Sequence, residues 1–437
     1  MERDVRADLL DWKEGAGRKP LLLKGARQVG KTWLLQDFAA KEYESCLYLN
    51  FEKDPRIGGL FEDSLEPSVI LKNLSLYLGK PVEAENRLII LDEIQVSNAA
   101  LNSLKYFSEE MPQAHIAAAG SLLGVKLSKS RSFPVGKVTL VDLHPMTFLE
   151  FLDAVSDGSL REFIESKEDL SPIPVPIHDK LVGLLREYYF VGGMPEVVAA
   201  YAERRDLVEV REIQEDILEG FQLDFAKYAP SSDFPKIVRI WESIPAHLSR
   251  ENKKFQYSKI RKGGRARDYE AGLAWLVHAG LLHKCLRVST PKLPLRTYAD
   301  PRAFKTYVLD VGLLCAMARL DPRVLIEGER IFVEFHGALV ENYVSQQLIT
   351  KGDRVHYWAT DTGGQAEVDF LIEQGASIYP LEVKAGINLK SKSLASYGAK
   401  YGPRALCRSN LKNFDARGAY ENYPLYAVSR VAELGLG

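Results

Sequence analysis

The first third of the chain alternates short apolar runs with segments of helical periodicity. Residues 31–41, KTWLLQDFAAK, have helical spacing. Because the apolar runs are hydrophobic at nearly every position and helical segments separate them, the pattern predicts a parallel sheet covered on both faces. The expected strands are LLLKG (21–25), CLYLNFE (46–52), RLIILDE (87–93), HIAAAGS (115–121) and KVTLVDL (137–143).

The remainder of the chain divides into a helical part and a mixed part. Residues 146–230 have mainly helical patterns, interrupted at 171–178 by a proline-rich segment that we expect to be a loop. Residues 267–288 are expected to form the last helix and the wing strand of a winged helix. Towards the C-terminus, the pattern predicts helices at 331–349 and 393–402, strands at 356–361, 366–373 and 377–386, and a last strand ending in PLYAVS (424–429).

Composition narrows the class of protein. A chain of 437 residues is too long for one ordinary core, so two or three domains are expected. The 57 basic and 59 acidic residues nearly cancel, so net charge predicts no nucleic-acid partner, although a local basic patch is compatible with it. The N-terminus is too charged for a signal peptide, and no apolar run approaches the ~18–20 residues of a membrane-spanning helix. Widely spaced cysteines (Cys46, Cys285, Cys315 and Cys407) are typical of buried, reduced thiols in a cytoplasmic protein.

The segment GARQVGKT follows the first strand and opens the first helix, where a phosphate-binding loop has to lie. Glycines permit a tight turn that directs backbone N–H groups at phosphate oxygens, and the positive end of the helix dipole points at the same anions. Lys31 is expected to reach the β and γ phosphates of ATP, and the Thr32 hydroxyl to bind Mg²⁺. The full predicted nucleotide-binding segment is Gly25, Ala26, Arg27, Gln28, Val29, Gly30, Lys31, Thr32 and Trp33.

Two further strand ends supply candidates for the same site. Asp92 ends a buried strand and is expected to support Mg²⁺, while Glu93 is expected to orient or deprotonate the attacking water. A solvated turn is the alternative for this Asp-Glu pair. Ser121 is expected to contact the γ-phosphate or, alternatively, to cap a helix. Arg131 and Lys137 are the nearest basic candidates for a charge-stabilising role, and either is also compatible with an ordinary surface charge.

The C-terminal strands carry a second set of charged residues. Asp369 lies in one expected strand, and Glu382 and Lys384 lie two residues apart in the next, so that the last two project from one face. An Asp followed by Glu-x-Lys is the arrangement of PD-(D/E)xK nucleases. Asp369 and Glu382, with Glu341 on the preceding helix, are candidate Mg²⁺ ligands, and Lys384 would activate water. The alternative is a buried ion-pair cluster without activity.

Basic residues precede the expected winged-helix segment. A winged helix either contacts DNA phosphates through such residues or serves as a packing module with a solvated basic loop. The near-neutral net charge favours structure or protein contact. The residues concerned are Arg261, Lys262, Arg265 and Arg267.

Several of these segments together resemble one family. The chain is similar to bacterial and archaeal ATP-binding proteins that join an AAA-type (AAA_14) ATPase domain to a C-terminal domain of unknown function, DUF4143. The matching pieces are KGARQVGKTWLL, LIILDEIQ, AAGSLLG, LHPMTFLEFL, YYFVGGMPEVV, FQYSKIRKGGRARDYEAGLAWLVHAGLL, YVLDVGLL, GALVENYVSQQL and AEVDFLIEQGASIYPLEVKAG. The family usually has arginine where Lys137 stands, and lysine lacks the planar guanidinium fork.

The resemblance implies an α/β protein with a P-loop sheet, a helical and winged-helix middle, and a restriction-endonuclease-like C-terminal fold. We therefore expect a P-loop ATPase domain at 1–155, a helical region packing on it at 156–230, a winged-helix-like region at 231–320 and a PD-(D/E)xK nuclease-like domain at 321–437. The expected function is a cytoplasmic Mg²⁺-dependent ATPase whose nucleotide state controls the nuclease-like domain. The alternative is an ATP-dependent switch or scaffold that binds protein, DNA or RNA without cleavage. A homo-oligomer is a further candidate state, and no membrane association is expected.

Overall fold

The computed structural model describes residues 1–83, 86–129, 136–249, 254–321, 333–352, 355–360, 366–386 and 391–434. The chain forms two compact units. The first unit consists of residues 2–144 together with 278–281, and the second consists of residue 1 with 145–277 and 282–437. Each unit has its own sheet, and each is described separately below.

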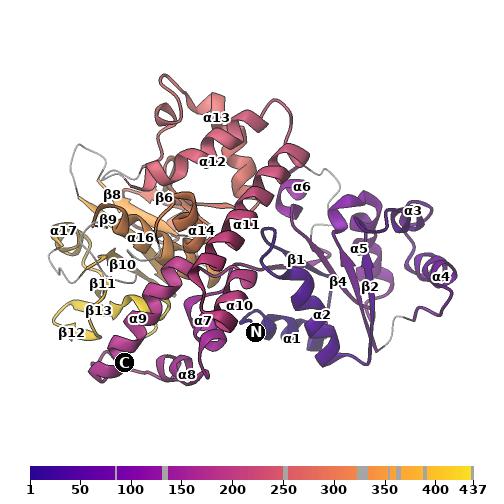
Figure 1. The fold of residues 1–437 in the computed structure, drawn as a ribbon, viewed down its shortest axis with the longest axis horizontal. Helices are drawn as coiled ribbons and strands as arrows, with labels where there is room; N and C mark the ends of the chain where they lie inside the picture. Colours follow the sequence, from indigo (N-terminus) through magenta and orange to yellow (C-terminus); the bar gives the residue numbers. More distant parts are fainter. Residues whose placement is uncertain are drawn as a thin grey trace. The chain divides into compact units, whose positions relative to one another are not determined.

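The first unit is a five-stranded sheet flanked by helices (indigo to purple in Figure 1). Its helices are α1 (Arg6–Glu14), α2 (Lys31–Glu42), α3 (Arg56–Glu62), α4 (Pro67–Leu78), η1 (Ile94–Val96), α5 (Asn98–Glu110) and α6 (Leu123–Lys129). Its strands are β1 (Leu21–Lys24), β2 (Ser45–Asn50), β3 (Arg87–Asp92), β4 (His115–Gly120) and β5 (Thr139–Asp142).

All five strands are parallel, in the order β2-β3-β4-β1-β5. The prediction of a parallel sheet is therefore confirmed, and every expected strand of this region is present within a few residues of its predicted bounds. Parallel strands end at the same edge of a sheet. Since β4 lies between β1 and β3, the residues that follow these three strands lie next to one another at the carboxyl edge, which brings together three segments far apart in the sequence.

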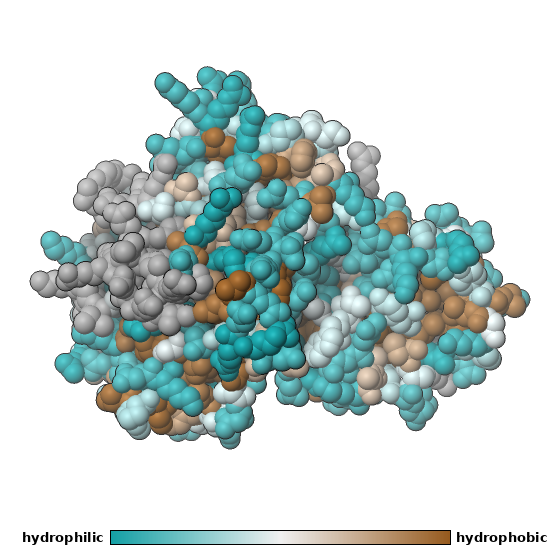
Figure 2. Space-filling model, viewed as in Figure 1, coloured by the Kyte–Doolittle hydropathy of each residue, from teal (hydrophilic) through white to brown (hydrophobic). Residues whose placement is uncertain are grey.

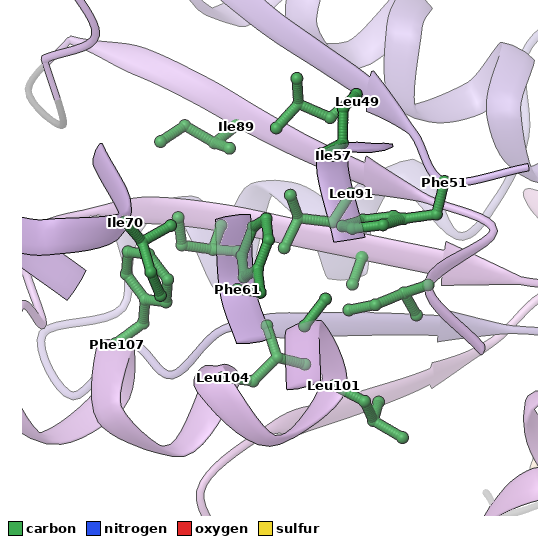
Figure 3. Packing of buried hydrophobic residues seen from close by; sticks show 14 of the residues in the cluster. Leu49, Phe51, Ile57, Phe61, Ile70, Ile89, Leu91, Leu101, Leu104 and Phe107 are labelled. Atoms are coloured by element: carbon green, nitrogen blue, oxygen red, sulfur yellow. The ribbon is translucent and has the colours of Figure 1, made fainter. Parts of the chain in front are cut away.

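A continuous apolar layer holds the helices α3, α4 and α5 on one face of this sheet. Leu49 and Leu91 project from β2 and β3 onto Phe61 of α3 and Leu104 of α5, and all of these side chains are at least 98% buried (Figure 3). Burying leucine and phenylalanine side chains stabilises a fold by about 1.5–3 kcal/mol each. Burial on both faces explains the near-continuous apolar runs of β1, β3 and β4, whereas the edge strands β2 and β5 also carry exposed residues.

The second unit combines a helical part with a mixed sheet. Its helices are α7 (Phe148–Val155), α8 (Ser159–Glu165), α9 (Val175–Val191), α10 (Pro195–Arg204), α11 (Leu207–Tyr228), α12 (Phe234–Leu248), η2 (Tyr257–Lys259), α13 (Ala266–His278), η3 (Leu295–Tyr298), α14 (Val311–Met317), α16 (Val333–Thr350), α17 (Lys392–Tyr401) and η5 (Leu425–Arg430). Its strands are β6 (Leu282–Val288), β7 (Ala299–Val308), β8 (His356–Ala359), β9 (Glu367–Gln374), β10 (Ser377–Val383), β11 (Leu406–Asn410), β12 (Asp415–Arg417) and β13 (Tyr420–Pro424).

The sheet of the second unit has eight strands in the order β12-β13-β11-β10-β9-β8-β6-β7. The antiparallel hairpin β6–β7, expected as the wing of a separate winged helix, pairs through β6 with β8 in parallel register. Backbone pairing therefore extends across residues 320 and 321, where we predicted a domain boundary. An exposed strand edge presents unpaired backbone groups that can pair with another chain. Strand β6 presents no such edge, because β7 and β8 pair with it on its two sides.

Buried side chains of α16 attach the helical part to this sheet. Asn342 accepts from the Val308 N–H at 2.8 Å and donates to the Val308 carbonyl at 3.0 Å. Gln347 accepts from the Phe148 N–H at 2.9 Å, at the start of α7. Both amides are at least 97% buried, and buried polar groups of this kind are expected to be hydrogen-bonded. Helix α7, predicted to belong to the ATPase domain ending at residue 155, is part of the second unit for this reason.

Two other expectations differ from the structure in detail. Residues 424–429 were expected to end a strand, but β13 ends at Pro424 and the 3-10 helix η5 begins at Leu425. Cys46 is exposed, whereas the other three cysteines are buried and all four are free thiols. No helix in the described part of the chain has the length and apolar character needed to cross a membrane.

The visible surface is mainly hydrophilic. A hydrophobic area is visible at the right of Figure 2. Among the exposed apolar side chains of the first unit, Leu76 of α4 is 73% exposed. Isolated exposed apolar residues of this kind are normal on folded proteins. Most residues of the apolar runs are therefore buried inside the two units.

The turn between α9 and α10 fits closely against two other segments of the second unit. Gly192 has φ 75°, and a Cβ there would lie 2.2 Å from Oδ1 of Asp310. Gly193 donates its N–H to Oδ2 of Asp310 at 2.6 Å, and its carbonyl accepts from the Met146 N–H at 2.6 Å. A Cβ on Gly193 would lie 2.0 Å from the Met146 carbonyl oxygen. Neither glycine can carry a side chain without moving buried backbone or a buried carboxylate.

We expect Gly193→Ala to destabilise the protein by about 3 kcal/mol, because the added methyl group overlaps a backbone oxygen that cannot move alone. Urea unfolding followed by circular dichroism measures the effect. Gly183→Ala is the matched control: a Cβ at this position of α9 meets nothing within 4 Å, so alanine should stabilise the helix slightly. Equal stability of the two variants would contradict the proposed close packing.

Candidate functional site

The loop between β1 and α2 has the backbone geometry that a phosphate site requires. Gly25 has φ 158°, and a Cβ there would lie 2.2 Å from the carbonyl oxygen of Leu143, next to the end of β5. Gly30 has φ 91° and is the N-cap residue of α2, which begins at Lys31. The first turn of α2 has no side-chain cap and no acidic residue. The uncapped N–H groups and the helix dipole together favour an anion at this point.

Two residues of the loop are buried and the two between them are exposed. Ala26 and Val29 are buried, whereas Arg27 and Gln28 are exposed. Arg3, near the N-terminus, is only 8% exposed and donates to the Val29 carbonyl at 3.1 Å and to the His144 carbonyl at 2.6 Å. This arginine ties the loop to the residues after β5. Sequence reasoning missed it, because no local pattern links a charged N-terminus to a loop 26 residues away.

The ammonium group of Lys31 lies inside the loop. Its Nζ donates to the carbonyls of Gly25 at 3.0 Å and Ala26 at 2.6 Å, and the side chain is 6% exposed. Burial lowers the pKa of Lys31 to about 8, although the charges of Glu93 and Asp92 act in the opposite direction. An anionic phosphate next to this ammonium would favour the charged form. An anion bound in the loop would therefore be stabilised by the Lys31 ammonium group.

Thr32 and Asp92 meet at the carboxyl edge of the sheet. The Thr32 hydroxyl donates to Oδ2 of Asp92 at 2.9 Å, across 60 residues of sequence. Asp92 is 2% exposed, and the same oxygen accepts from the Tyr48 hydroxyl at 2.7 Å. Burial and the hydrogen bond to Asp92 contribute to raising the pKa of Tyr48 to about 12. A hydroxyl and a carboxylate are hard oxygen ligands, so this pair is chemically suited to Mg²⁺.

Glu93 is oriented by residues that follow β3 and β4. It has φ 52°, and its Oε2 accepts from Gln95 Nε2 at 2.5 Å and lies 3.4 Å from the Ser121 hydroxyl that donates to it. A Cβ at Gly120 would lie 1.9 Å from Gln95 Oε1, so the glycine leaves space for this amide. The structure thus brings Glu93 and Ser121 together, as the order of strands requires. Sequence reasoning assigned no role to Gln95.

The other predicted residues of the first unit lie further from these contacts. Trp33 is 47% exposed on α2. Lys137 forms an ion pair with Glu109 at 2.9 Å, which fits the alternative of an ordinary surface charge. Arg131 lies outside the described residues.

The predicted residues of the second unit are also brought together. Lys384 forms an ion pair with Oε1 of Glu382 at 2.6 Å, just after β10. Asp369 on β9 accepts from the Val383 N–H at 2.9 Å. Glu341 on α16 accepts from the Tyr307 hydroxyl at 3.1 Å. Glu341 and Asp369 both contribute to raising the pKa of Lys384 against the opposing effect of burial, so all four charges interact.

Lys305 of β7 is the member of this cluster that sequence reasoning missed. Its Nζ forms ion pairs with Glu367 at 2.6 Å, Glu341 at 3.6 Å and Asp369 at 3.8 Å. Within the described parts of the chain, no group of three or more histidine, cysteine or acidic side chains is arranged to hold a metal ion. The carboxylates thus converge on an ammonium group in this structure.

Arg261, Lys262 and Arg265 lie between η2 and α13, and Arg267 lies in the first turn of α13. All four are exposed. Arg267 lies 3.8 Å from Asp268, its neighbour in sequence. The segment is therefore accessible, as either of its predicted roles requires.

Family models match three parts of the chain. Residues 17–152 match the AAA domain, residues 336–426 match a domain of unknown function (DUF4143), and residues 182–324 match another (DUF8612). The last of these includes β6 and β7. No curated protein matches the sequence significantly.

Among solved structures, a Walker-type ATPase of Pyrococcus abyssi is 16% identical, covering 72% of this chain and 95% of its own, with a TM-score of 0.46. The Aeropyrum pernix Orc1 protein in complex with DNA is 13% identical, with coverages of 73% and 93% and a TM-score of 0.32. The Thermotoga maritima RuvB Holliday junction branch migration motor is 16% identical, with coverages of 68% and 90% and a TM-score of 0.29. With identities and TM-scores this low, no residue role follows from these likenesses.

We expect Gln95→Ala to lower kcat for ATP hydrolysis by about tenfold while changing KM less than about twofold, because Gln95 donates a hydrogen bond to the Glu93 carboxylate, which is predicted to act on water and not on the phosphates. Steady-state phosphate release measures both constants. Gln113→Ala, an exposed glutamine of the same unit, should leave both unchanged. A change in KM alone would show that Gln95 acts on nucleotide binding instead.

Proposed function

We propose that this chain, which carries an AAA domain at 17–152 and a DUF4143 domain at 336–426, is a Mg²⁺-dependent ATPase whose nucleotide state controls a nuclease-like C-terminal unit. The observation that carries the ATPase proposal is the hydrogen bond between Thr32 and Asp92. It joins the phosphate loop to the end of β3, so that groups suited to phosphate, Mg²⁺ and water lie at one edge of the sheet.

Each residue has a chemical task in this proposal. Lys31 and the backbone N–H groups of the loop bind and orient the β and γ phosphates, and the positive charge stabilises the negative charge that moves to the leaving group. Thr32 and Asp92 hold Mg²⁺, which when bound neutralises phosphate charge. Glu93 orients the attacking water and accepts its proton, and Ser121 lies on the same side of the site to sense the γ-phosphate.

The nuclease-like part of the proposal is supported by the convergence of Asp369, Glu382 and Lys384 at the ends of β9 and β10. In this arrangement the two carboxylates would bind Mg²⁺, together with Glu341 from α16, and Lys384 would activate water. The chain offers exposed basic residues in the same unit, such as Arg261 and Lys262, for the phosphates of a DNA or RNA substrate.

A second candidate function is an ATP-dependent switch that binds nucleic acid or protein without cleaving it. The specific observation in its favour is Lys305, whose ammonium group already pairs with two of the carboxylates predicted to bind metal, Glu341 and Asp369. A cluster neutralised in this way contributes to structure without requiring an ion. The two candidates differ only in the C-terminal chemistry and share the ATPase site.

We expect Lys31→Ala to abolish tight ATP binding and Glu93→Gln to retain binding while slowing hydrolysis by about a hundredfold or more, because only the second change leaves the phosphate-binding groups intact. Calorimetric titration with ATP and Mg²⁺ and single-turnover hydrolysis separate the two effects. Lys41→Ala, which removes a 47% exposed lysine of the same helix, is the control and should behave as wild type. Undiminished turnover in both site variants would refute the assignment.

For the nuclease-like unit, we expect cleavage of plasmid, single-stranded DNA or RNA in the presence of Mg²⁺ or Mn²⁺ to depend on ATP and to be lost in Asp369→Ala, which removes a proposed metal ligand. Gel electrophoresis of the products is the measurement. Asp179→Ala, an exposed aspartate on α9, is the matched control. If no substrate is cut with either metal while ATP hydrolysis is intact, the switch without cleavage is the correct alternative.

A further inference from the structure

Lys305 is one of the most deeply buried charged groups of the second unit. It lies on β7 opposite Cys285 of β6, and its side chain is 1% exposed. Its Nζ lies 5.0 Å from the centre of the Tyr357 ring, on β8. Removing an ammonium group from water costs several kcal/mol unless nearby negative charge compensates it. A lysine in this position therefore needs anionic partners that the fold itself supplies.

Three carboxylates from two elements supply that compensation. Glu367 and Asp369 are two residues apart on β9 and so project from the same face of the strand, at 2.6 and 3.8 Å from the ammonium group. Glu341 approaches from α16 at 3.6 Å. The contacts are ion pairs arranged around one cation, rather than a single aligned hydrogen bond. Three carboxylates therefore face one ammonium group, two of them at spacings wider than the oxygen-to-metal distances of a metal site.

The carboxylates are held in place by contacts that do not involve Lys305. Glu341 accepts from the Tyr307 hydroxyl, and Asp369 accepts from the Val383 N–H. The following residue on α16, Asn342, is bound through both its donor and its acceptor to the backbone of Val308 on β7. The position of the helix is therefore fixed against the strand that carries Lys305. The cluster is a built site in which the lysine and its partners are separately positioned.

Acidic side chains outnumber the lysines among the described residues of the cluster. Glu382 pairs with Lys384, and Lys305 pairs with Glu341, Glu367 and Asp369. Burial by itself would lower the pKa of Lys305, but the surrounding negative groups, led by Glu341, outweigh this effect and raise it well above its ordinary value. Without Lys305, the largely buried carboxylates of Glu341 and Asp369 and the partly exposed carboxylate of Glu367 would lose the cation that they share.

We propose that the ammonium group of Lys305 is the resident cation of this carboxylate cluster and holds Glu341, Glu367 and Asp369 together in place of a divalent metal ion. The proposal concerns the second unit alone and is independent of ATP hydrolysis by the first. It bears on the proposed function, because a cluster that Lys305 holds in place of a metal ion supports the second candidate, the switch without cleavage, over Mg²⁺ binding by Glu341 and Asp369. It also assigns a role to a residue outside the Asp…Glu-x-Lys pattern. It also identifies the change that turns the cluster into a metal site, which is neutralisation of Lys305.

The test uses the full chain without nucleotide. Lys305→Met keeps much of the side-chain length and removes the charge. We expect isothermal titration with Mn²⁺ to detect a site in this variant that is at least about tenfold tighter than any site in the wild type, because three carboxylates then lack a cation. The added site should disappear in the double variant Lys305→Met/Asp369→Asn. Lys351→Met, which removes a lysine paired with Glu433, is the control and should gain no site.

Thermal unfolding of the wild-type protein provides a measurement that does not depend on the folding of any Lys305 variant. The unfolding midpoint of the wild type should be the same in chelator as in excess Mn²⁺. Any Mn²⁺ effect that is also seen in Asp369→Asn arises at another site and is subtracted. In Lys305→Met, by contrast, Mn²⁺ should raise the midpoint. A wild-type increase with Mn²⁺ that Asp369→Asn abolishes would overturn the proposal, since the cluster would then hold a metal beside Lys305. A folded Lys305→Met protein that gains no Mn²⁺ site would overturn it as well.

Discussion

A lysine ammonium group that leaves water must find negative charge or carbonyl oxygens within the fold, and each unit of this protein contains such a group at the centre of its charged site. In the first unit, Lys31 is held by two backbone carbonyls of the phosphate loop. In the second, Lys305 is surrounded by three carboxylates. The cost of burying the charge is large in both cases, so the surrounding backbone and side chains have to be positioned accurately around it.

The two lysines differ in how completely they are compensated, and this difference explains what each site is suited to do. Neutral carbonyls stabilise the Lys31 ammonium only in part, so that its pKa is lowered to about 8 and an incoming anion would complete its surroundings. The carboxylates around Lys305 overcompensate, so that its pKa is raised. The first site therefore favours a phosphate ligand, and the second is satisfied by the chain itself. A buried lysine is thus part of a ligand site in the first unit, and in the second unit it is the counter-ion of carboxylates of the same chain.

The topology of each sheet determines which residues can share these sites. In the first unit, β4 lies between β1 and β3, so Lys31, Asp92 and Ser121 follow neighbouring parallel strands and meet at one edge. In the second unit, the hairpin β6–β7 is paired with β8, which places Lys305 beside Glu367 and Asp369 of β9 although more than 60 residues separate them in sequence. Helix α16 contributes Glu341 to the cluster, and the hydrogen bond from the Val308 N–H to Asn342 holds this helix against β7.

Local sequence determined the elements whose signals are contained in a few consecutive residues. The apolar runs predicted the five parallel strands, and the spacing of Gly25, Gly30, Lys31 and Thr32 predicted the phosphate loop, because turn geometry and helix start depend on neighbouring residues alone. The Asp, then Glu-x-Lys pattern likewise identified residues that lie together in the second unit. Only the tertiary structure decided the contributions of Arg3, Gln95 and Lys305, the inclusion of the wing hairpin in the large sheet, and the assignment of α7 to the second unit. Each of these depends on contacts between segments distant in sequence, and a charged residue in a single sequence has the same appearance whether it becomes a solvated surface group or the buried partner of a carboxylate.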